Sequence, residues 1–334
     1  TGPNGAGKTT LLEALHLLSA ARSFRAKKEN ELCRWGQSEV LVEGHFQTSD
    51  GHSRNLSLSW RRTDGEWRKQ AGFQGDPVAR QADFLGCVPL SLFTPSDLGL
   101  VSGAPAVRRR YIDLMLSKMS PLHLQELARL KTVLASRNAI LRQGRSSRET
   151  KPWDQLLFQL SLTVGRRREG LVSTLNEICQ TFFEQLTSKE RGIQLYYRRC
   201  WPTEWDEFQA RLRELYPREV QRGATLLSPH KDELEIQRQE RSLRLYGSQG
   251  EQRLVALCLR LAEAKQLAEH KKEPAILLLD DAFSELDPER RARLLALLPD
   301  FSQVFLTSAT PLEISLPYRV HRFSEGSLLP DSES

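Results

Sequence analysis

The chain has 334 residues, of which 39% are hydrophobic and 27% charged, and its formal net charge is +6. This composition is that of an ordinary globular protein, and the length fits one large domain or two. No apolar run approaches the roughly 18 residues that cross a bilayer, and the first residues are polar, so the sequence predicts a cytoplasmic protein without a membrane segment.

Charge is spread unevenly along the chain. Residues 1–100 carry a net charge of +1, residues 101–223 carry +9, and residues 224–334 carry −4. The basic middle segment favours a polyanionic partner, although a basic helical face is about as often simply solvated. The five cysteines are widely spaced and form no CxxC pair, which argues against a zinc site or a disulfide framework.

Antiparallel strands are expected in the first hundred residues. Alternating patterns separated by turns predict an antiparallel meander over residues 39–47, 56–60 and 66–69. A further strand is predicted over residues 87–93. The tryptophans, Trp60 and Trp67 among them, are assigned to the core or to a sheet face rather than to base stacking.

Helical spacing of apolar residues begins after Pro105. It predicts two long amphipathic helices, joined by the hydrophilic connector 143–151, as a helical hairpin domain that ends near Gly223. Two strands are expected next, over 233–237 and 241–246. The last third then alternates a helix at 254–264, a strand at 275–279, a helix after Pro288 and a strand at 303–307. This alternation is typical of a parallel sheet covered by helices.

The chain opens on a full match to the pattern GxxxxGK[ST]. Glycines let backbone N–H groups point at phosphate oxygens, Lys8 adds a cation, and the Thr9 hydroxyl can ligate Mg²⁺. This motif normally follows a strand, and only Thr1 precedes it, so we expect that a preceding strand is missing from the sequence. The candidate nucleotide-binding residues are Gly2, Pro3, Asn4, Gly5, Ala6, Gly7, Lys8, Thr9 and Thr10.

The apolar run 275–279 ends on Asp280 and Asp281, at the edge where open α/β sheets bind ligands. Asp280 is expected to hold Mg²⁺ through water, and Asp281 to orient the attacking water as a general base. The candidate catalytic residues are therefore Lys8, Asp280 and Asp281, and the candidate metal ligands are Thr9 and Asp280.

A polar turn from Gly247 to Gly250 runs into a helix, whose N-terminus is either a second anion site or an ordinary Ser-capped end. The turn Ser284-Glu-Leu-Asp287 follows the two aspartates. This order of motifs resembles the ABC ATPase superfamily. The resemblance implies an α/β fold, namely an ABC-type P-loop ATPase head (1–100 and 224–334) that includes an antiparallel β-subdomain, with an inserted α-helical hairpin domain (101–223).

The same resemblance implies an ATP-dependent homodimer in which each subunit caps the ATP held by the other. The signature residues that would do so are Ser248, Gln249, Gly250, Glu251 and Gln252, and the D-loop residues are Ser284 and Asp287. The strand at 303–307 is followed by Ser308, so the switch histidine of many ABC heads is absent.

Segments along nearly the whole chain are similar to the RecF family of bacterial DNA replication and repair proteins. They include Ser23-Phe-Arg25, Thr94-Pro-Ser-Asp-Leu98, Arg108-Arg-Arg-Tyr-Ile-Asp113 and Ser228-Pro-His-Lys-Asp232. The resemblance implies slow hydrolysis of ATP to ADP and phosphate, and ATP-dependent binding to double-stranded and gapped DNA. It also implies cooperation with RecR and RecO to load RecA during recombinational repair and the SOS response.

Two clusters of three arginines are candidates for contact with DNA phosphates. They comprise Arg108, Arg109, Arg110, Arg166, Arg167 and Arg168.

Three alternative functions stay open: a transporter-type ATPase subunit, an SMC-like protein, and a clamp that binds ATP with negligible turnover because Asp281 replaces the usual glutamate. The insertion 101–223 is too large for the compact helical subdomain of a transporter subunit, yet it allows only a few heptads of coiled coil.

Overall fold

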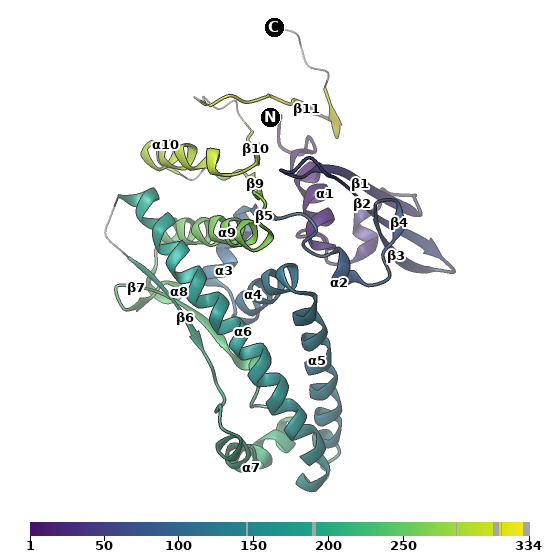
Figure 1. Cartoon of the computed structure of the whole chain (residues 1–334), viewed down its shortest axis with the longest axis vertical. Coiled ribbons are helices and arrows are strands. Elements are labelled where there is room, and N and C mark those ends of the chain that lie inside the picture. The colour runs from purple at the N-terminus through teal and green to yellow at the C-terminus, as the bar shows by residue number, and fades with distance from the viewer. Residues whose placement is uncertain (145, 189–191, 285, 310–313, 315, 330–334) are drawn as a thin grey trace. The chain divides into compact units, whose positions relative to one another are not determined.

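A computed structural model of the chain describes residues 1–144, 146–188, 192–284, 286–309, 314 and 316–329 (Figure 1). It contains two compact units. The first, here called the head unit, comprises Thr1–Leu98, Ile178–Gly192 and Gln249–Ser334; the second, called the helical unit, comprises Gly99–Glu177 and Ile193–Ser248. The domain limits at residues 101 and 223 remain predictions from the sequence.

A three-stranded parallel sheet lies at the centre of the head unit. Its order is β10-β9-β5, formed by Gln303–Thr307, Ile276–Asp280 and Leu90–Phe93. In the middle strand Leu277, Leu278 and Leu279 are all 0% exposed. Both faces of this strand are covered, which explains why its sequence reads as a continuous apolar run rather than an alternating one. The strands predicted at 275–279 and 303–307 are confirmed.

Helices pack on this sheet through apolar faces. Helix α1 (Lys8–Ala20) contacts all three strands and buries Leu12, Leu17 and Leu18, and α9 (Gln249–Lys271) contacts β5 and β9. The helix predicted over 254–264 is thereby confirmed. The remaining short helices of the unit are η1 (Glu29–Leu32), α2 (Gln81–Phe84), η2 (Pro95–Asp97), α10 (Pro288–Leu297) and η4 (Leu298–Asp300).

The predicted antiparallel meander is also confirmed. Its four strands follow chain order: β1 (Glu39–Gln47), β2 (Ser53–Thr63), β3 (Glu66–Phe73) and β4 (Asp76–Pro77). Helix α1 lies against β1 and β2 (Figure 1). The approach is so close that a Cβ added at Gly44 would lie 2.5 Å from Leu18 Cδ1. Trp60 is 1% exposed, as assigned, but Trp35 is 102% exposed, so its assignment to core or sheet is wrong.

A small hairpin near the end of the chain contacts residues 1–8, which carry the GxxxxGK part of the motif and are here called the phosphate loop. Strands β11 (Phe323–Ser324) and β12 (Ser327–Leu328) pair with each other. The Phe323 N–H donates to Thr1 O at 2.9 Å, and the Gly326 N–H donates to Ala6 O at 3.1 Å.

The helical unit is built around long helices and one small antiparallel sheet. Its helices are α3 (Leu98–Ser102), α4 (Pro105–Met119), α5 (Pro121–Arg142), the part of α6 (Ser147–Thr187) up to Glu177, α7 (Trp205–Arg222), η3 (Pro229–Lys231) and α8 (Leu243–Tyr246). The sheet has the order β6-β7-β8, formed by Ile193–Arg198, Glu233–Arg238 and Arg241–Ser242. None of the helices in the described ranges has the length and hydropathy needed to cross a bilayer.

The core of this unit joins α5, α6 and α7. Leu130 and Val133 of α5 cluster with Leu157 and Phe158 of α6 and with Phe208 of α7. The rings of Phe158 and Phe208 lie 5.0 Å apart, within the range of favourable aromatic pairs. The two long helices predicted from apolar spacing are therefore confirmed.

Two details of the helical unit differ from the expectation. The strand predicted over 241–246 is wrong, because only Arg241–Ser242 pairs with β7 and Leu243–Tyr246 forms a helical turn. The strand β6 was not predicted. It pairs antiparallel with β7, placing Leu195 opposite Ile236, so a distant segment stabilises what is only a short alternating pattern in the sequence.

A buried ion-pair network holds the three helices together. Arg137 is 0% exposed, and its guanidinium donates to Asp154 Oδ1 at 2.8 Å, Glu219 Oε2 at 2.7 Å and Thr225 Oγ1 at 3.0 Å. Burial alone would lower the pKa of Arg137, but its bonds to Glu219 and Asp154 raise it. The network is fully satisfied, which is the condition under which a buried charge is tolerated.

Replacing Arg137→Ala leaves Glu219, itself 0% exposed, without its cation. We expect the free energy of unfolding of the helical unit to fall by about 3–5 kcal/mol, measured by urea denaturation. Arg148→Ala is the matched control, since that exposed side chain should change stability by less than about 0.5 kcal/mol. Equal effects of the two substitutions would contradict a stabilising role for the network.

Candidate functional site

A cavity of about 290 Å³ lies in the head unit beside the carboxyl end of the parallel sheet. It is lined by residues from the beginning and the end of the sequence: Asn4, Gly5, Ala6, Gly7, Lys8, Thr9, Thr10, Arg25, Asp280, Asp281, Thr307, Ser308 and Ala309. The structure thus brings seven of the nine candidate nucleotide-binding residues together with both candidate carboxylates. Gly2 and Pro3 do not line the cavity, but their carbonyl groups contact Lys8.

Left-handed glycines shape the loop that forms one wall. Gly2, Gly5 and Gly7 have φ values of 148°, 82° and 102°, which residues with a Cβ rarely adopt. Space is also limited, because a Cβ at Gly2 would lie 2.5 Å from Phe323 O. Gly7 caps the N-terminus of α1, so the partial positive charge of a 13-residue helix is directed at the cavity.

The side chain of Lys8 folds back over this loop. Its Nζ donates to Gly2 O and, at 2.9 Å, to Pro3 O. The ammonium group is therefore held by backbone carbonyls close to the N–H groups of the loop, which creates a concentrated positive region for an anionic ligand.

Two hydroxyl groups hold the carboxylate of Asp280. Thr9 Oγ1 donates to Oδ1 at 3.0 Å and to Oδ2 at 3.2 Å, and Thr307 Oγ1 donates to Oδ1 at 2.6 Å. Asp280 is only 9% exposed, so its remaining open direction is the cavity that it lines. Three oxygen-bearing side chains thus meet at one point of the wall.

Asp281 differs from its neighbour in backbone and exposure. Its φ is 51°, in the left-handed region, and its side chain is exposed. The Asp281 N–H donates to Thr307 Oγ1 at 3.2 Å, and Ser284 Oγ donates to Asp281 O at 2.9 Å. These bonds fix the bend that follows β9 and place the carboxylate at the mouth of the cavity.

Sequence reasoning missed four residues that line this cavity: Arg25, Thr307, Ser308 and Ala309. Thr307 is directly opposite Asp280 in the register of β10 and β9, so a hydroxyl at the end of the neighbouring parallel strand was the available signal. Arg25 also lines the cavity, and its Nη1 lies 3.5 Å from Glu13 Oε2. The available signal was its place in Ser23-Phe-Arg25, one of the segments that resemble the RecF family, although its charge and spacing alone did not point to the cavity.

The signature residues lie at the start of α9. Ser248, Gln249 and Gly250 are exposed, Glu251 is half-buried, and Gln252 is buried. Among the residues that the structure describes, none of these five lines the cavity. Their action on a second subunit's nucleotide stays a prediction.

The D-loop residues lie between β9 and α10. Ser284 contacts the backbone of Asp281, and Asp287 caps α10 by accepting from the Arg290 N–H at 2.9 Å. The hydrogen bond from the Arg290 backbone lowers the pKa of Asp287. Glu285 of the predicted D-loop lies outside the described residues.

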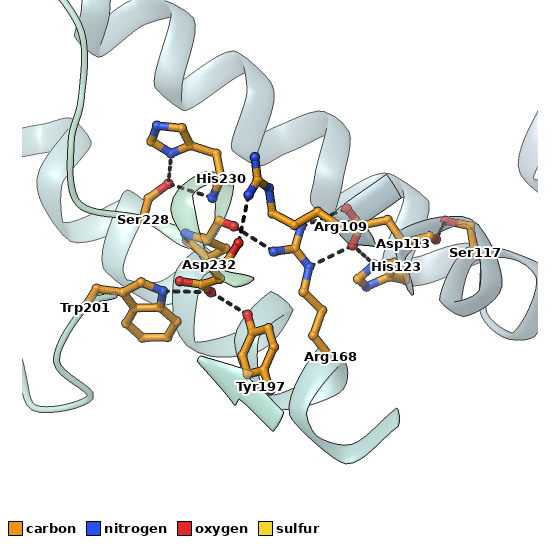
Figure 2. A network of polar contacts seen from close by, with 11 residues as sticks. Arg109, Asp113, Ser117, His123, Arg168, Tyr197, Trp201, Ser228, His230 and Asp232 are labelled. Carbon is orange, nitrogen blue, oxygen red and sulfur yellow. Dashed lines mark hydrogen bonds and ion pairs between the residues drawn. The ribbon is translucent and has the colours of Figure 1, made fainter. Parts of the chain in front are cut away.

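Two of the six candidate DNA contacts are buried in the helical unit. Arg108 is 3% exposed and pairs with Glu233 at 2.7 and 3.0 Å. Arg168 is also 3% exposed and pairs with Asp113 at 2.8 and 2.7 Å, as Figure 2 shows. Their guanidinium groups are occupied inside the unit, so the prediction that these two bind DNA phosphates is corrected to a structural role.

The other four arginines are more accessible. Arg109 is half-buried and donates to Asp232 O at 2.8 Å, and Arg167 pairs with Glu126 at 2.7 Å. Arg110 and Arg166 are exposed, and neither side chain has a partner within the described part of the chain. Contact with DNA remains a prediction, best suited to Arg110 and Arg166.

Comparison with known proteins agrees with this geometry. The parallel sheet, the phosphate loop with its facing carboxylates, the antiparallel β-subdomain and the inserted helices define an ABC-type P-loop ATPase head. The family described as RecF/RecN/SMC N terminal domain matches residues 1–316.

Individual relatives narrow the assignment. The DNA replication and repair protein RecF of Heliobacterium modesticaldum is 37% identical, across 99% of this chain and 92% of the relative. That of Herpetosiphon aurantiacus is 35% identical, across 93% of this chain and 86% of the relative. The solved structure of the recombination mediator protein RecF-ATPrS in the RecFOR pathway matches with a TM-score of 0.85 and 24% identity, over 98% of this chain and 90% of that one. The chain belongs to the RecF family, which confirms the resemblance and the predicted fold class.

Replacing Thr307→Val removes one hydroxyl from Asp280 and leaves the Asp281 N–H without its acceptor. We expect the free energy of unfolding of the head unit to fall by about 1–3 kcal/mol, because a buried polar group loses its partner. Thr307→Ser keeps the hydroxyl and should retain most of the stability. Urea denaturation measures both, and equal losses for the two variants would contradict a specific stabilising role of the Thr307 hydroxyl.

Acid should weaken the helical unit through His230. Burial lowers the pKa of His230 to about 4, and the positive charges of Lys231 and Arg109 act in the same direction. The unfolded chain therefore binds a proton first as the pH falls, so stability is lost from pH 6.5 down to about 4.

His230→Gln should reduce this loss, because the variant has no group that titrates at this position. Urea midpoints measured across that pH range provide the test, and parallel curves for the wild type and His230→Gln would contradict it.

Proposed function

We propose that the chain is an ATP-dependent DNA-binding ATPase of recombinational repair and replication-fork maintenance, in which ATP closes a head-to-tail dimer on double-stranded DNA near single-strand gaps. One observation carries this proposal: the phosphate loop and Asp280 share a single cavity, joined by the hydrogen bond from Thr9 Oγ1 at 3.0 Å. A loop that binds phosphate and a carboxylate that binds metal are useful together only when both act on one nucleotide.

The cavity suits the phosphates of ATP. Backbone N–H groups at the start of α1 and the ammonium of Lys8 supply donors for phosphate oxygens. Arg25, which also lines the cavity, adds a guanidinium whose side chain is 53% exposed and able to reorient.

The donor set also suits Mg²⁺. Thr9 Oγ1 and the carboxylate of Asp280 are hard oxygen donors already within hydrogen-bond distance, which is the chemistry that this cation prefers. Bound there, Mg²⁺ would neutralise charge on the phosphate oxygens. Thr307 would keep the Asp280 carboxylate oriented, and the exposed carboxylate of Asp281 would accept a hydrogen bond from the attacking water.

An ATP-dependent homodimer accounts for the signature residues. Ser248, Gln249 and Gly250 lie exposed at the N-terminus of α9, and none of the five signature residues lines the chain's own cavity as the structure describes it, so a second subunit is the natural site of their action. Leu245 and Tyr246, just before them, are 71% and 74% exposed. Apolar side chains at that level of exposure favour burial against a partner.

The DNA and protein partners follow from the family. Its relatives are named for DNA replication and repair, and one solved relative is named a recombination mediator of the RecFOR pathway. For this chain we propose binding to double-stranded and gapped DNA and cooperation with RecR and RecO, with an indirect effect on RecA. All of this would take place in the cytoplasm. Arg110 and Arg166 are the proposed phosphate contacts in the helical unit.

A clamp that binds ATP but barely hydrolyses it is the second candidate. Asp281 carries a side chain one methylene shorter than glutamate, and its exposed carboxylate has no side-chain partner among the residues that the structure describes. Such a group orients water less firmly, which favours a slow reaction.

Three variants test the proposal by sedimentation and single-turnover hydrolysis with Mg²⁺ and ATP. We expect Lys8→Ala and Asp280→Asn to abolish ATP-driven dimerisation, because they remove phosphate and metal contacts. Asp281→Asn should still dimerise but hydrolyse roughly 10²–10⁴-fold more slowly, as expected for loss of a general base.

Asp300→Asn, at an exposed residue outside the cavity lining, is the matched control. Dimerisation of the Lys8 and Asp280 variants at wild-type ATP concentrations would refute the proposed cycle. Hydrolysis unchanged by Asp281→Asn would favour the clamp with negligible turnover.

A further inference from the structure

The segment between α1 and β1 presents a fully exposed tryptophan. Trp35 is 102% exposed, whereas Trp60 is 1% exposed. It occupies a turn in which the Gln37 N–H donates to Arg34 O at 3.0 Å and Gly36 has a left-handed φ of 80°. The turn directs the indole into solvent, where its large apolar surface contributes nothing to the packing of the head unit.

Hydrogen bonds within the segment keep its backbone in place. Ser23 Oγ accepts from the Arg25 and Ala26 N–H groups at 2.8 and 2.7 Å. Glu31, which lies in η1, accepts through Oε2 from the Lys27 N–H at 2.8 Å. Trp35 is thus presented from a structured connection, so binding a ligand there requires little additional ordering.

The sequence segment that contains this tryptophan is rich in positive charge. We call residues 22–37 the basic turn segment; it contains two carboxylates, Glu29 and Glu31, and five cations, Arg22, Arg25, Lys27, Lys28 and Arg34. Lys27, Lys28 and Arg34 are exposed, and their side chains have no partner within the described ranges. The cations therefore remain available to neutralise an external polyanion.

We propose that the basic turn segment binds unpaired nucleotides of single-stranded DNA. Trp35 stacks on a base, while Lys27, Lys28 and Arg34 contact the phosphates on either side. An exposed indole in a segment rich in exposed cations matches this ligand better than a duplex, since paired bases offer no free face for stacking. The inference rests on the proposed DNA-binding function and assigns to it a surface that recognises the single-stranded part of a gap.

The position of the segment adds a link to the nucleotide. Arg25, near its start, lines the cavity and contacts Glu13 of α1. Phosphates bound in the cavity would attract Arg25 and so act directly on the turn that Ser23 caps.

The test measures affinities of the full chain with ATP for a fluorescein-labelled oligo-dT and for a blunt duplex. Trp35→Ala should weaken binding to oligo-dT roughly tenfold, the scale of one lost stacking contact, and leave duplex binding within about twofold. Trp35→Phe should restore most of the affinity because it keeps an aromatic face. Unchanged ATP affinity in both variants verifies the fold of the head unit.

Charge is tested separately by the double variant Lys27→Gln with Lys28→Gln. In a plot of the logarithm of the oligo-dT binding constant against the logarithm of the salt concentration, the slope should become shallower by about 1.4. This is the change expected for two lost phosphate contacts. Lys272→Gln, an exposed lysine outside the segment, is the control and should leave the slope unchanged.

Failure of this inference is distinct from failure of the proposed function. If the wild type with ATP binds neither oligo-dT nor duplex, both fail. If the wild type binds DNA and the Trp35→Ala variant binds oligo-dT with the same affinity as the wild type, only the inference is overturned. That result would be expected if Trp35 were instead an anchor for a protein partner. Equal weakening on both DNAs also overturns it, because that result excludes a contact specific to unpaired bases.

Discussion

The carboxylate of Asp280 is the point on which the head unit depends. It accepts a hydrogen bond from Thr9 at the start of α1, 271 residues earlier in the sequence, and another from Thr307 at the end of β10. The buried strand β9 delivers this group to the sheet edge, and left-handed glycines allow the facing loop to approach. A nucleotide site results because one loop of donors and one fixed carboxylate face the same cavity.

Positive charge has two different roles in the two units. In the helical unit many arginines act inside the structure: Arg108, Arg137 and Arg168 are all nearly or fully buried and bonded to carboxylates. The surplus of positive charge in residues 101–223 therefore overstates what is available to DNA. In the head unit the basic turn segment leaves its lysines exposed, so fewer charges present a more accessible surface.

Patterns that act locally were predictable from the sequence. The phosphate loop, the apolar strand β9 and the long helices α5 and α6 each follow from short-range spacing. What was missed depends on distant partners: β6 is a strand because β7 pairs with it, and Thr307 joins the site because β10 lies beside β9. The burial of Arg168 likewise depends on Asp113, and no periodicity in the sequence reveals such a pairing.

A crystal structure of the chain with Mg²⁺ and a non-hydrolysable ATP analogue tests the central claim most directly. We expect phosphate oxygens within hydrogen-bond distance of the backbone N–H groups of residues 5–8, and Mg²⁺ bound by Thr9 Oγ1 at about 2.0–2.1 Å with Asp280 beside it. An analogue whose phosphates lie outside the loop, or a metal ion remote from Asp280, would contradict it.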